Sequence, residues 1–194
     1  MTRRSQQGLV IFVTASRVPL AAAAAAIVAF ASARSPGAWA ALALLLAVEA
    51  TDALDGVLAR HFGVAGRFGE LFDPYCDSVA RLVTYFGLAS AGLCPWWLVL
   101  VMALRDVSVA YIRIMCAVAG RAAAARLSGK LKAIVQGAGA IALAASLAIA
   151  PAAETPLPVL RSAVAWAVAA VTVWSLADYF AAAVRPQKTA RPVK

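Results

Sequence analysis

The feature that most constrains this sequence is a succession of long apolar stretches separated by short turn-forming segments. A membrane-spanning helix needs about 20 mostly apolar residues, because the hydrocarbon core of a bilayer is about 30 Å thick. Six stretches meet this requirement, at residues 9–33, 36–60, 70–92, 95–119, 131–150 and 158–184. The segments between them contain Gly and Pro, which interrupt helices. We therefore expect an all-α membrane domain with six transmembrane helices over residues 1–185, followed by a basic, disordered tail over residues 186–194.

The composition excludes an ordinary soluble domain. Hydrophobic residues make up 63% and charged residues 14% of the 194 positions, whereas soluble domains average about 45–50% and about 25%. The net charge is +9, but the basic residues lie between apolar stretches instead of on one polar face, so we expect no nucleic-acid partner. The three cysteines show no CxxC or Cys/His spacing, and they predict neither a zinc site nor a redox motif.

The distribution of basic residues predicts the orientation of the helices. Cytoplasmic loops of membrane proteins carry an excess of Lys and Arg. If the N-terminus is cytoplasmic, the loops expected outside hold only Arg34 and Arg161, whereas the other loops and both ends are rich in basic residues. We therefore predict a multi-pass protein of the inner membrane with both termini cytoplasmic. The stretch 9–33 is longer than the ~7–15-residue core of a signal peptide, so it is expected to be the first membrane helix.

Carboxylates are concentrated near the junction of the second and third apolar stretches. Four of the nine acidic residues lie there at helical spacing: Asp52, Asp55, Asp73 and Asp77. Spacings of three and four residues place each pair on one face of a helix, and a short loop brings the two pairs to the same depth. Four carboxylates at membrane depth repel one another, and each costs about 2.5–3.5 kcal/mol on insertion scales. Divalent cations remove both penalties, so we predict a site for two Mg²⁺ or Mn²⁺ ions.

An alternative interpretation is that the aspartates pair with arginines and only hold the helices together. The candidate partners are Arg60, Arg67 and Arg81. Small residues beside the acids favour a ligand site instead, because they let a bulky molecule approach the backbone. Gly56 follows Asp55 directly, and Gly69 precedes Asp73 by four residues. The combination of acids and small residues therefore indicates a ligand site.

Together these residues form a spaced motif that resembles the signature of the CDP-alcohol phosphatidyltransferases. Its fixed positions are all matched in this chain: Asp52, Asp55, Gly56, Ala59, Arg60, Gly69, Asp73 and Asp77. Eight specified residues at set spacing make a chance match improbable, and six apolar stretches agree with the topology of that family. The resemblance implies an enzyme that transfers a phosphatidyl group from CDP-diacylglycerol to a small alcohol and releases CMP.

The resemblance also implies a role for each residue of the motif, at an active site that faces the cytoplasm. Asp52, Asp55 and Asp73 would bind a divalent metal. Asp77 would also approach the metal and would act as the general base toward the acceptor hydroxyl. The residues that would border the CDP moiety are Gly56, Arg60 and Gly69.

A segment near the N-terminus carries a second resemblance. Residues 13–17 are similar to a Leu-Thr-x-x-Arg segment in the first helix of many family members, so Thr14 and Arg17 are expected to contact the nucleotide. The alternative for Arg17 is that its guanidinium extends to lipid headgroups. The resemblance further implies a homodimer.

The fourth apolar stretch carries charged residues that predict a pocket for the second substrate. Charged side chains inside a membrane are functional candidates by default. Asp106 and Arg113 are seven residues apart, so they share a helix face and could pair. Four basic residues could bind the phosphate of a phosphorylated acceptor: Arg105, Arg113, Lys130 and Lys132. For the lysines, the alternative is that they only reflect the excess of positive charge on the cytoplasmic side.

The order of these residues resembles the phosphatidylglycerophosphate synthase branch, whose acceptor is sn-glycerol 3-phosphate. This chain departs from the branch at Asp106, where Glu is usual, and at Ala133, where Thr is usual. A phosphatidylinositol-phosphate synthase that uses myo-inositol phosphate is therefore an alternative. The expected partners in both cases are CDP-diacylglycerol, a phosphorylated polyol and the lipid bilayer.

Two other classes of protein could use an aspartate cluster in a membrane. An aspartate-rich prenyltransferase also binds a metal-diphosphate, but its motifs are spaced differently and lie far apart in sequence. A small cation transporter would be a non-enzyme alternative, but it has no evident use for Gly56, Arg60 and Gly69.

Overall fold

The computed structural model describes residues 3–62, 67–119, 126–149 and 157–185. Within these residues the chain is all-helical, as the sequence predicts. The helices are α1 (Arg3–Phe30), α2 (Pro36–Phe62), α3 (Arg67–Ser90), α4 (Trp96–Val118), α5 (Leu127–Ile149) and α6 (Leu157–Val184).

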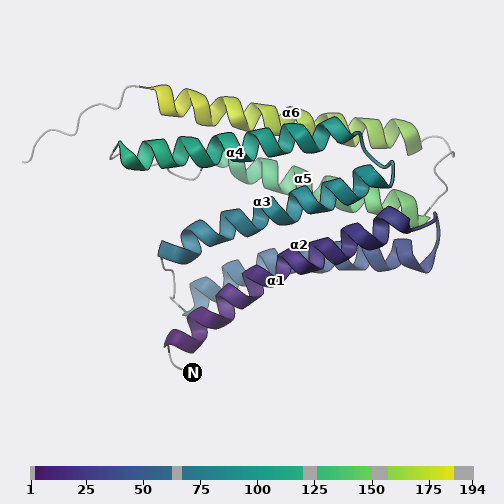
Figure 1. Cartoon of the computed structure of the whole chain (residues 1–194), viewed down its shortest axis with the longest axis horizontal. Helices are drawn as coiled ribbons and strands as arrows, with labels where there is room; N and C mark the ends of the chain where they lie inside the picture. Colours follow the sequence, from purple (N-terminus) through teal and green to yellow (C-terminus); the bar gives the residue numbers. More distant parts are fainter. Residues whose placement is uncertain (1–2, 63–66, 120–125, 150–156, 186–194) are drawn as a thin grey trace, which may run out of the picture.

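The helices run back and forth along one long axis and form two groups (Figure 1). In the first group α1 packs against both α2 and α3, and in the second group α6 packs against both α4 and α5. The two groups are joined by contacts of α5 with α2 and α3 and by contacts of α4 with α3. The starts of α1, α3 and α5 lie at the same end of the bundle as the ends of α2, α4 and α6. We call this the charged end, because the predicted site residues belong to it.

At the end of the bundle opposite the charged end, the helices begin and stop next to turn-forming residues of the sequence. Ser35 precedes α2, and its Oγ accepts a hydrogen bond of 3.2 Å from the backbone N–H of Ala38, which satisfies a free donor of the first turn. Gly92 has a φ of +70° just after α3, a left-handed conformation that glycine adopts without steric cost. In the turn between α1 and α2, the backbone N–H of Arg34 donates a hydrogen bond of 3.0 Å to the carbonyl of Leu147 and so connects this turn to α5.

Three helices in the described residues are long and apolar enough to cross a membrane by length and composition, at Ser5–Phe30, Leu127–Ile149 and Leu157–Val184. The apolar part of α2 is shorter, and it covers Pro36–Thr51. Charged side chains interrupt the apolar sequence of α3 and α4. The six-span topology and the cytoplasmic location of both termini therefore stay predictions.

The surface of the bundle carries many large apolar side chains, as a protein embedded in lipid requires. Soluble monomers rarely expose apolar patches of more than a few hundred Å². Here exposed apolar side chains occur along several helices, and examples are Phe12, Trp39, Phe86, Tyr111, Trp166 and Phe180. The interior is instead lined with small residues of α1 and α2, such as Ala21, Ala24, Ala38 and Ala41. Small side chains let helices approach closely where lipid surrounds them.

Helices α1 and α3 approach each other closely at Gly87. A Cβ atom at this position would lie 2.5 Å from the Cα and 2.8 Å from the carbonyl oxygen of Ala25. Both of these atoms belong to the backbone of α1, so no side-chain rotation can make room.

Gly87→Ala is therefore expected to destabilise the protein by about 1–3 kcal/mol, because it forces α1 and α3 apart. The matched control is Gly8→Ala on α1, where a Cβ would meet nothing within 4 Å. That change should be neutral or stabilising by up to about 1 kcal/mol through helix propensity. The measurement is the midpoint of denaturant-induced unfolding in detergent micelles, and equal midpoints for the two variants would contradict the prediction.

Candidate active site

The second pair of predicted aspartates lies one helical turn apart on α3 and faces α1. The Thr14 hydroxyl of α1 donates a hydrogen bond of 3.4 Å to Oδ1 of Asp73. Arg17, one turn further along α1, forms an ion pair with Asp77. The Arg17 side chain is 3% exposed, whereas that of Asp77 is 41% exposed. The structure thus brings together four residues that the sequence assigned to one site from two separate motifs.

The first pair of aspartates belongs to the last part of α2. The structure describes the backbone of this part of α2 but not the side chains of Asp52, Asp55 and Arg60 or the surroundings of Gly56. Gly69 belongs to the first turn of α3, and a Cβ there would meet nothing within 4 Å. Among the described residues, no three His, Cys, Asp or Glu side chains come together as a metal site. The four-aspartate metal centre therefore stays a prediction.

The described half of the site has the chemistry that a hard divalent cation requires. Asp73 and Asp77 offer carboxylate oxygens, the ligands that Mg²⁺ and Mn²⁺ prefer. Arg17 supplies the positive charge that balances Asp77 in this arrangement. The exposed fraction of Asp77 leaves part of its carboxylate open to a ligand. The residues present therefore fit the predicted metal.

An ion pair that the sequence did not predict joins α2 to α3 behind the aspartates. Arg81 contacts Glu49 with both terminal nitrogens, at 3.1 and 3.3 Å. Glu49 precedes Asp52 by three residues and Arg81 follows Asp77 by four, so the pair lies one turn from each aspartate along its helix. Arg81 was one candidate partner of the aspartates, but the structure pairs it with Glu49.

The same ion pair also contacts α5. A Cβ on Gly137 would lie 2.5 Å from Oε2 of Glu49 and 3.0 Å from Nη1 of Arg81. Glu49, Arg81 and Asp77 line a narrow pocket with residues of α1 and α5. Three helices therefore meet at one partly buried charge pair beneath the candidate site.

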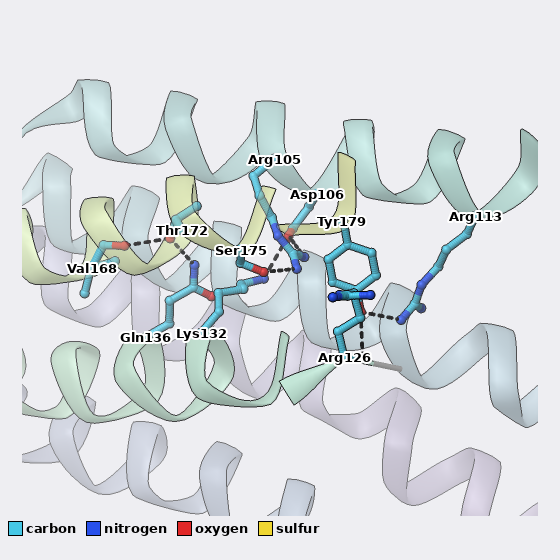
Figure 2. A network of polar contacts seen from close by, with 10 residues as sticks. All are labelled: Arg105, Asp106, Arg113, Arg126, Lys132, Gln136, Val168, Thr172, Ser175 and Tyr179. Carbon is cyan, nitrogen blue, oxygen red and sulfur yellow. Dashed lines mark hydrogen bonds and ion pairs between the residues drawn. The ribbon is translucent and has the colours of Figure 1, made fainter. Parts of the chain in front are cut away.

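A second polar network fills the space between α4, α5 and α6 (Figure 2). Oδ1 of Asp106 accepts hydrogen bonds of 2.8 Å from Arg105 and of 2.8 Å from Nζ of Lys132. Arg105 also donates to the hydroxyl of Ser175 at 2.7 Å. The carboxylate of Asp106 is only 6% exposed. Two of the predicted phosphate-binding cations thus lie together, but they share one buried carboxylate.

The pairing of Asp106 with Arg113 that their spacing allowed does not form in the structure. Arg113 instead donates a hydrogen bond of 3.1 Å to the hydroxyl of Tyr179 on α6. The backbone geometry explains the difference, because α5 brings Lys132 to the Asp106 side of α4 and α6 brings Tyr179 to the Arg113 side. Lys130, the fourth predicted cation, lies exposed at the start of α5.

The first turn of α5 is fixed to the end of α6. Asp178 accepts hydrogen bonds of 2.6 and 2.7 Å from Arg126 and one of 2.5 Å from the Ser128 hydroxyl. The hydrogen bonds that Arg126 donates to Asp178 raise the pKa of the Arg126 guanidinium above its ordinary value. Sequence reasoning missed these residues, although the acidic Asp178 at the end of an apolar stretch was a usable signal.

Fold and site together define an all-helical protein of membrane type, with paired aspartates between α1 and α3 and buried cations between α4, α5 and α6. The sequence matches the CDP-alcohol phosphatidyltransferase family over residues 11–174. The chain belongs to this family, and the resemblance drawn from the motif is confirmed.

Individual relatives are similar over parts of the chain. A Mycobacterium tuberculosis (strain CDC 1551 / Oshkosh) protein named "Probable phosphatidylglycerophosphate synthase" is 35% identical over 135 residues, which are 70% of this chain and 61% of that protein. A Treponema pallidum (strain Nichols) protein named CDP-diacylglycerol–glycerol-3-phosphate 3-phosphatidyltransferase is 33% identical over 89 residues, 46% of this chain and 41% of that protein. The chain thus matches about three fifths of the length of the first of these relatives.

One solved structure shares the fold. It is the crystal structure of phosphatidylinositol phosphate synthase from Mycobacterium tuberculosis with CDP-DAG bound. The TM-score is 0.57 at 18% identity, and the match covers 97% of this chain and 98% of that one. At this identity the likeness establishes the arrangement of the helices alone.

Proposed function

We propose that this protein transfers a phosphatidyl group from CDP-diacylglycerol to sn-glycerol 3-phosphate and releases CMP. The observation that carries the proposal is the meeting of Thr14 and Arg17 with the aspartates of the family motif. Two motifs that are distant in sequence contribute to one site, as a shared substrate requires. Relatives named as synthases of phosphatidylglycerophosphate support the choice of acceptor.

In the proposed reaction Asp77 accepts the proton of the acceptor hydroxyl. The acceptor oxygen forms a bond to the β-phosphorus of CDP-diacylglycerol, and the bond from that phosphorus to the oxygen of CMP breaks. A carboxylate is a weak base for an alcohol, so positioning of the hydroxyl must supply much of the rate. Arg17 orients Asp77 through their ion pair, and its guanidinium would contact the diphosphate as CMP leaves. Asp52, Asp55, Asp73 and Asp77 would hold the Mg²⁺ or Mn²⁺ ions that neutralise charge on the diphosphate.

The acceptor phosphate is proposed to bind at the cations of α4 and α5. Arg105 and Lys132 share the single carboxylate of Asp106, so this buried group carries a net positive charge. Arg113 and Lys130 are more exposed and would meet the phosphate first. A fixed excess of positive charge attracts a phosphorylated alcohol more strongly than a neutral one.

We further propose that the charged end of the bundle faces the cytoplasm and that six helices span the inner membrane. The excess of basic residues in the segments at this end supports that orientation. The CDP moiety would then bind at the cytoplasmic surface, bordered by Gly56, Arg60 and Gly69. The water-soluble acceptor is available at this surface. A homodimer stays an expectation from the family.

An assay of the purified protein with CDP-diacylglycerol, Mg²⁺ and a panel of alcohols tests the proposal through CMP release. Glycerol 3-phosphate is expected to give the fastest release, ahead of myo-inositol phosphate and of unphosphorylated serine. Faster release with myo-inositol phosphate would favour the alternative branch, which the shared fold with a phosphatidylinositol phosphate synthase makes worth testing. Metal uptake into proteoliposomes without any CMP release would instead support a cation transporter.

A further inference from the structure

Tyr179 on α6 contacts both arginines that the proposed function assigns to the acceptor phosphate. Its ring centroid lies 5.3 Å from the guanidinium carbon of Arg105 and 5.6 Å from that of Arg113. Figure 2 shows the ring between these two side chains. The Tyr179 side chain is buried, with 5% of its surface exposed. A guanidinium within about 6 Å of an aromatic centroid is attracted by the ring face.

The hydroxyl of Tyr179 adds polar contacts to two helices. It accepts hydrogen bonds of 3.1 Å from Nη2 of Arg113 and of 3.4 Å from the backbone N–H of Arg126. A Cβ on Gly129 would lie 3.1 Å from the same oxygen, so the hydroxyl packs directly against the first turn of α5. Tyr179 therefore contacts α4 at both arginines and contacts α5 at the residue before Lys130.

The neighbouring Asp178 explains why Tyr179 has a fixed position. Its carboxylate binds Arg126 in a two-bond arrangement and also accepts a hydrogen bond from Ser128. Two successive residues of α6 are thus attached to the start of α5. This attachment holds the part of α6 that carries Tyr179 against the start of α5.

These contacts bear on binding because a free arginine side chain has many rotamers, and ordering it on binding reduces affinity. Arg105 and Arg113 also carry like charges on one face of α4, so they tend to separate. A ring between them, with a hydroxyl that accepts from Arg113, holds both guanidiniums in place before a phosphate arrives. Such preorganisation increases affinity without any contact to the ligand itself.

We propose that Tyr179 is a positioning residue for the phosphate of the acceptor, acting through Arg113, Arg105 and the first turn of α5. The inference rests on the proposed function, since it takes these cations as the acceptor site. The ligand class is a small phosphomonoester. Tyr179 sets the affinity for that ligand and has no part in binding CDP-diacylglycerol.

Two substitutions separate the contributions of the hydroxyl and of the ring. Tyr179→Phe removes only the hydroxyl, and the KM for glycerol 3-phosphate is expected to rise about 3–10-fold. Tyr179→Leu also removes the ring, and the rise should exceed that of Tyr179→Phe. The KM for CDP-diacylglycerol should stay within about twofold in both. The matched control is Tyr111→Phe on α4, whose side chain is exposed, and it should change neither KM.

A double variant tests whether Tyr179 acts through Arg113. Arg113→Ala alone should raise the acceptor KM, and adding Tyr179→Phe to it should raise this KM little further, because the hydroxyl no longer has the Arg113 guanidinium to hold in place. Independent, multiplying effects of the two substitutions would overturn the inference. A parallel rise in the KM values of both substrates would also overturn it, because that is the result of a general loss of structure.

A separate experiment distinguishes failure of this inference from failure of the proposed function. It measures the binding of inorganic phosphate as a shift in the thermal unfolding temperature of the detergent-solubilised protein. Weaker phosphate binding in Tyr179→Phe than in the wild type supports the positioning role, even if CMP release selects another phosphorylated acceptor. Equal phosphate binding and an equal acceptor KM overturn that role while wild-type CMP release still supports the function. Absence of CMP release from the wild type with every phosphorylated alcohol overturns the function itself.

Discussion

Asp77→Asn is expected to lower the rate of CMP release at saturating substrates by at least about 10²–10⁴-fold, the usual contribution of a general base. The amide cannot accept the proton of the acceptor hydroxyl, and it is also a poorer ligand for a hard cation. CDP-diacylglycerol should still bind, because Thr14 and Arg17 are unchanged. The measurement pairs single-turnover CMP release with CDP-diacylglycerol binding to the detergent-solubilised variant.

The same substitution also separates the two interpretations of the aspartate motif. If Asp77 only holds α3 to α1 through Arg17, Asp77→Asn should lower the unfolding midpoint and leave the rate per folded molecule nearly intact. A matched control is Glu154→Gln, the same acid-to-amide change in the segment between α5 and α6. It should leave CMP release unchanged. A rate within tenfold of the wild type for Asp77→Asn would remove this residue as the base.

The helices could be predicted well because apolar length and turn residues act locally. At the end away from the charged end, α2 begins at Pro36 as the sequence indicated, and α3 ends at Ser90, two residues before the predicted bound at Gly92. The starts of α1 at Arg3 and of α5 at Leu127 lie before the predicted apolar stretches. Hydropathy measures apolarity and not helicity, and residues such as Arg, Gln and Lys extend helices readily into a polar environment.

From spacing alone, the candidate site could be predicted only where its residues share a helix face, and the contact of Thr14 and Arg17 with the aspartates was predicted through the family resemblance. Asp73 and Asp77 required nothing more than a spacing of four. The sequence could not predict which side chain of another helix pairs with a given charge. Asp106 shares a helix face with Arg113 by spacing, but in the structure it is bound by Arg105 and Lys132. Which cation a buried carboxylate binds depends on how α5 and α6 pack on α4, and the sequence pattern carries no information about that packing.

Asp106→Asn is expected to destabilise the protein by about 3–5 kcal/mol, because it leaves two buried cations without their shared carboxylate. The side chains of Arg105 and Lys132 are 9% and 8% exposed, so water cannot replace the lost partner. The measurement is the free energy of unfolding in detergent micelles. The control is Asp178→Asn, the same chemical change in a pair with Arg126 that is 27–35% exposed. It should cost less, since partly exposed ion pairs contribute about 0–1 kcal/mol.

A double variant shows whether the penalty arises from unpaired charge. Lys132→Met removes one cation, and Asp106 then keeps Arg105 as its partner. In Asp106→Asn with Lys132→Met only one cation stays unpaired, so the double variant should be less destabilised than the sum of the two single changes by about 0.5–3 kcal/mol. Additive effects would mean that Asp106 contributes through packing instead of charge. Non-additive effects of the two substitutions would establish that the Asp106 carboxylate stabilises both buried cations through their charge. That stabilisation allows α4 and α5 to present a net positive charge to a phosphorylated acceptor.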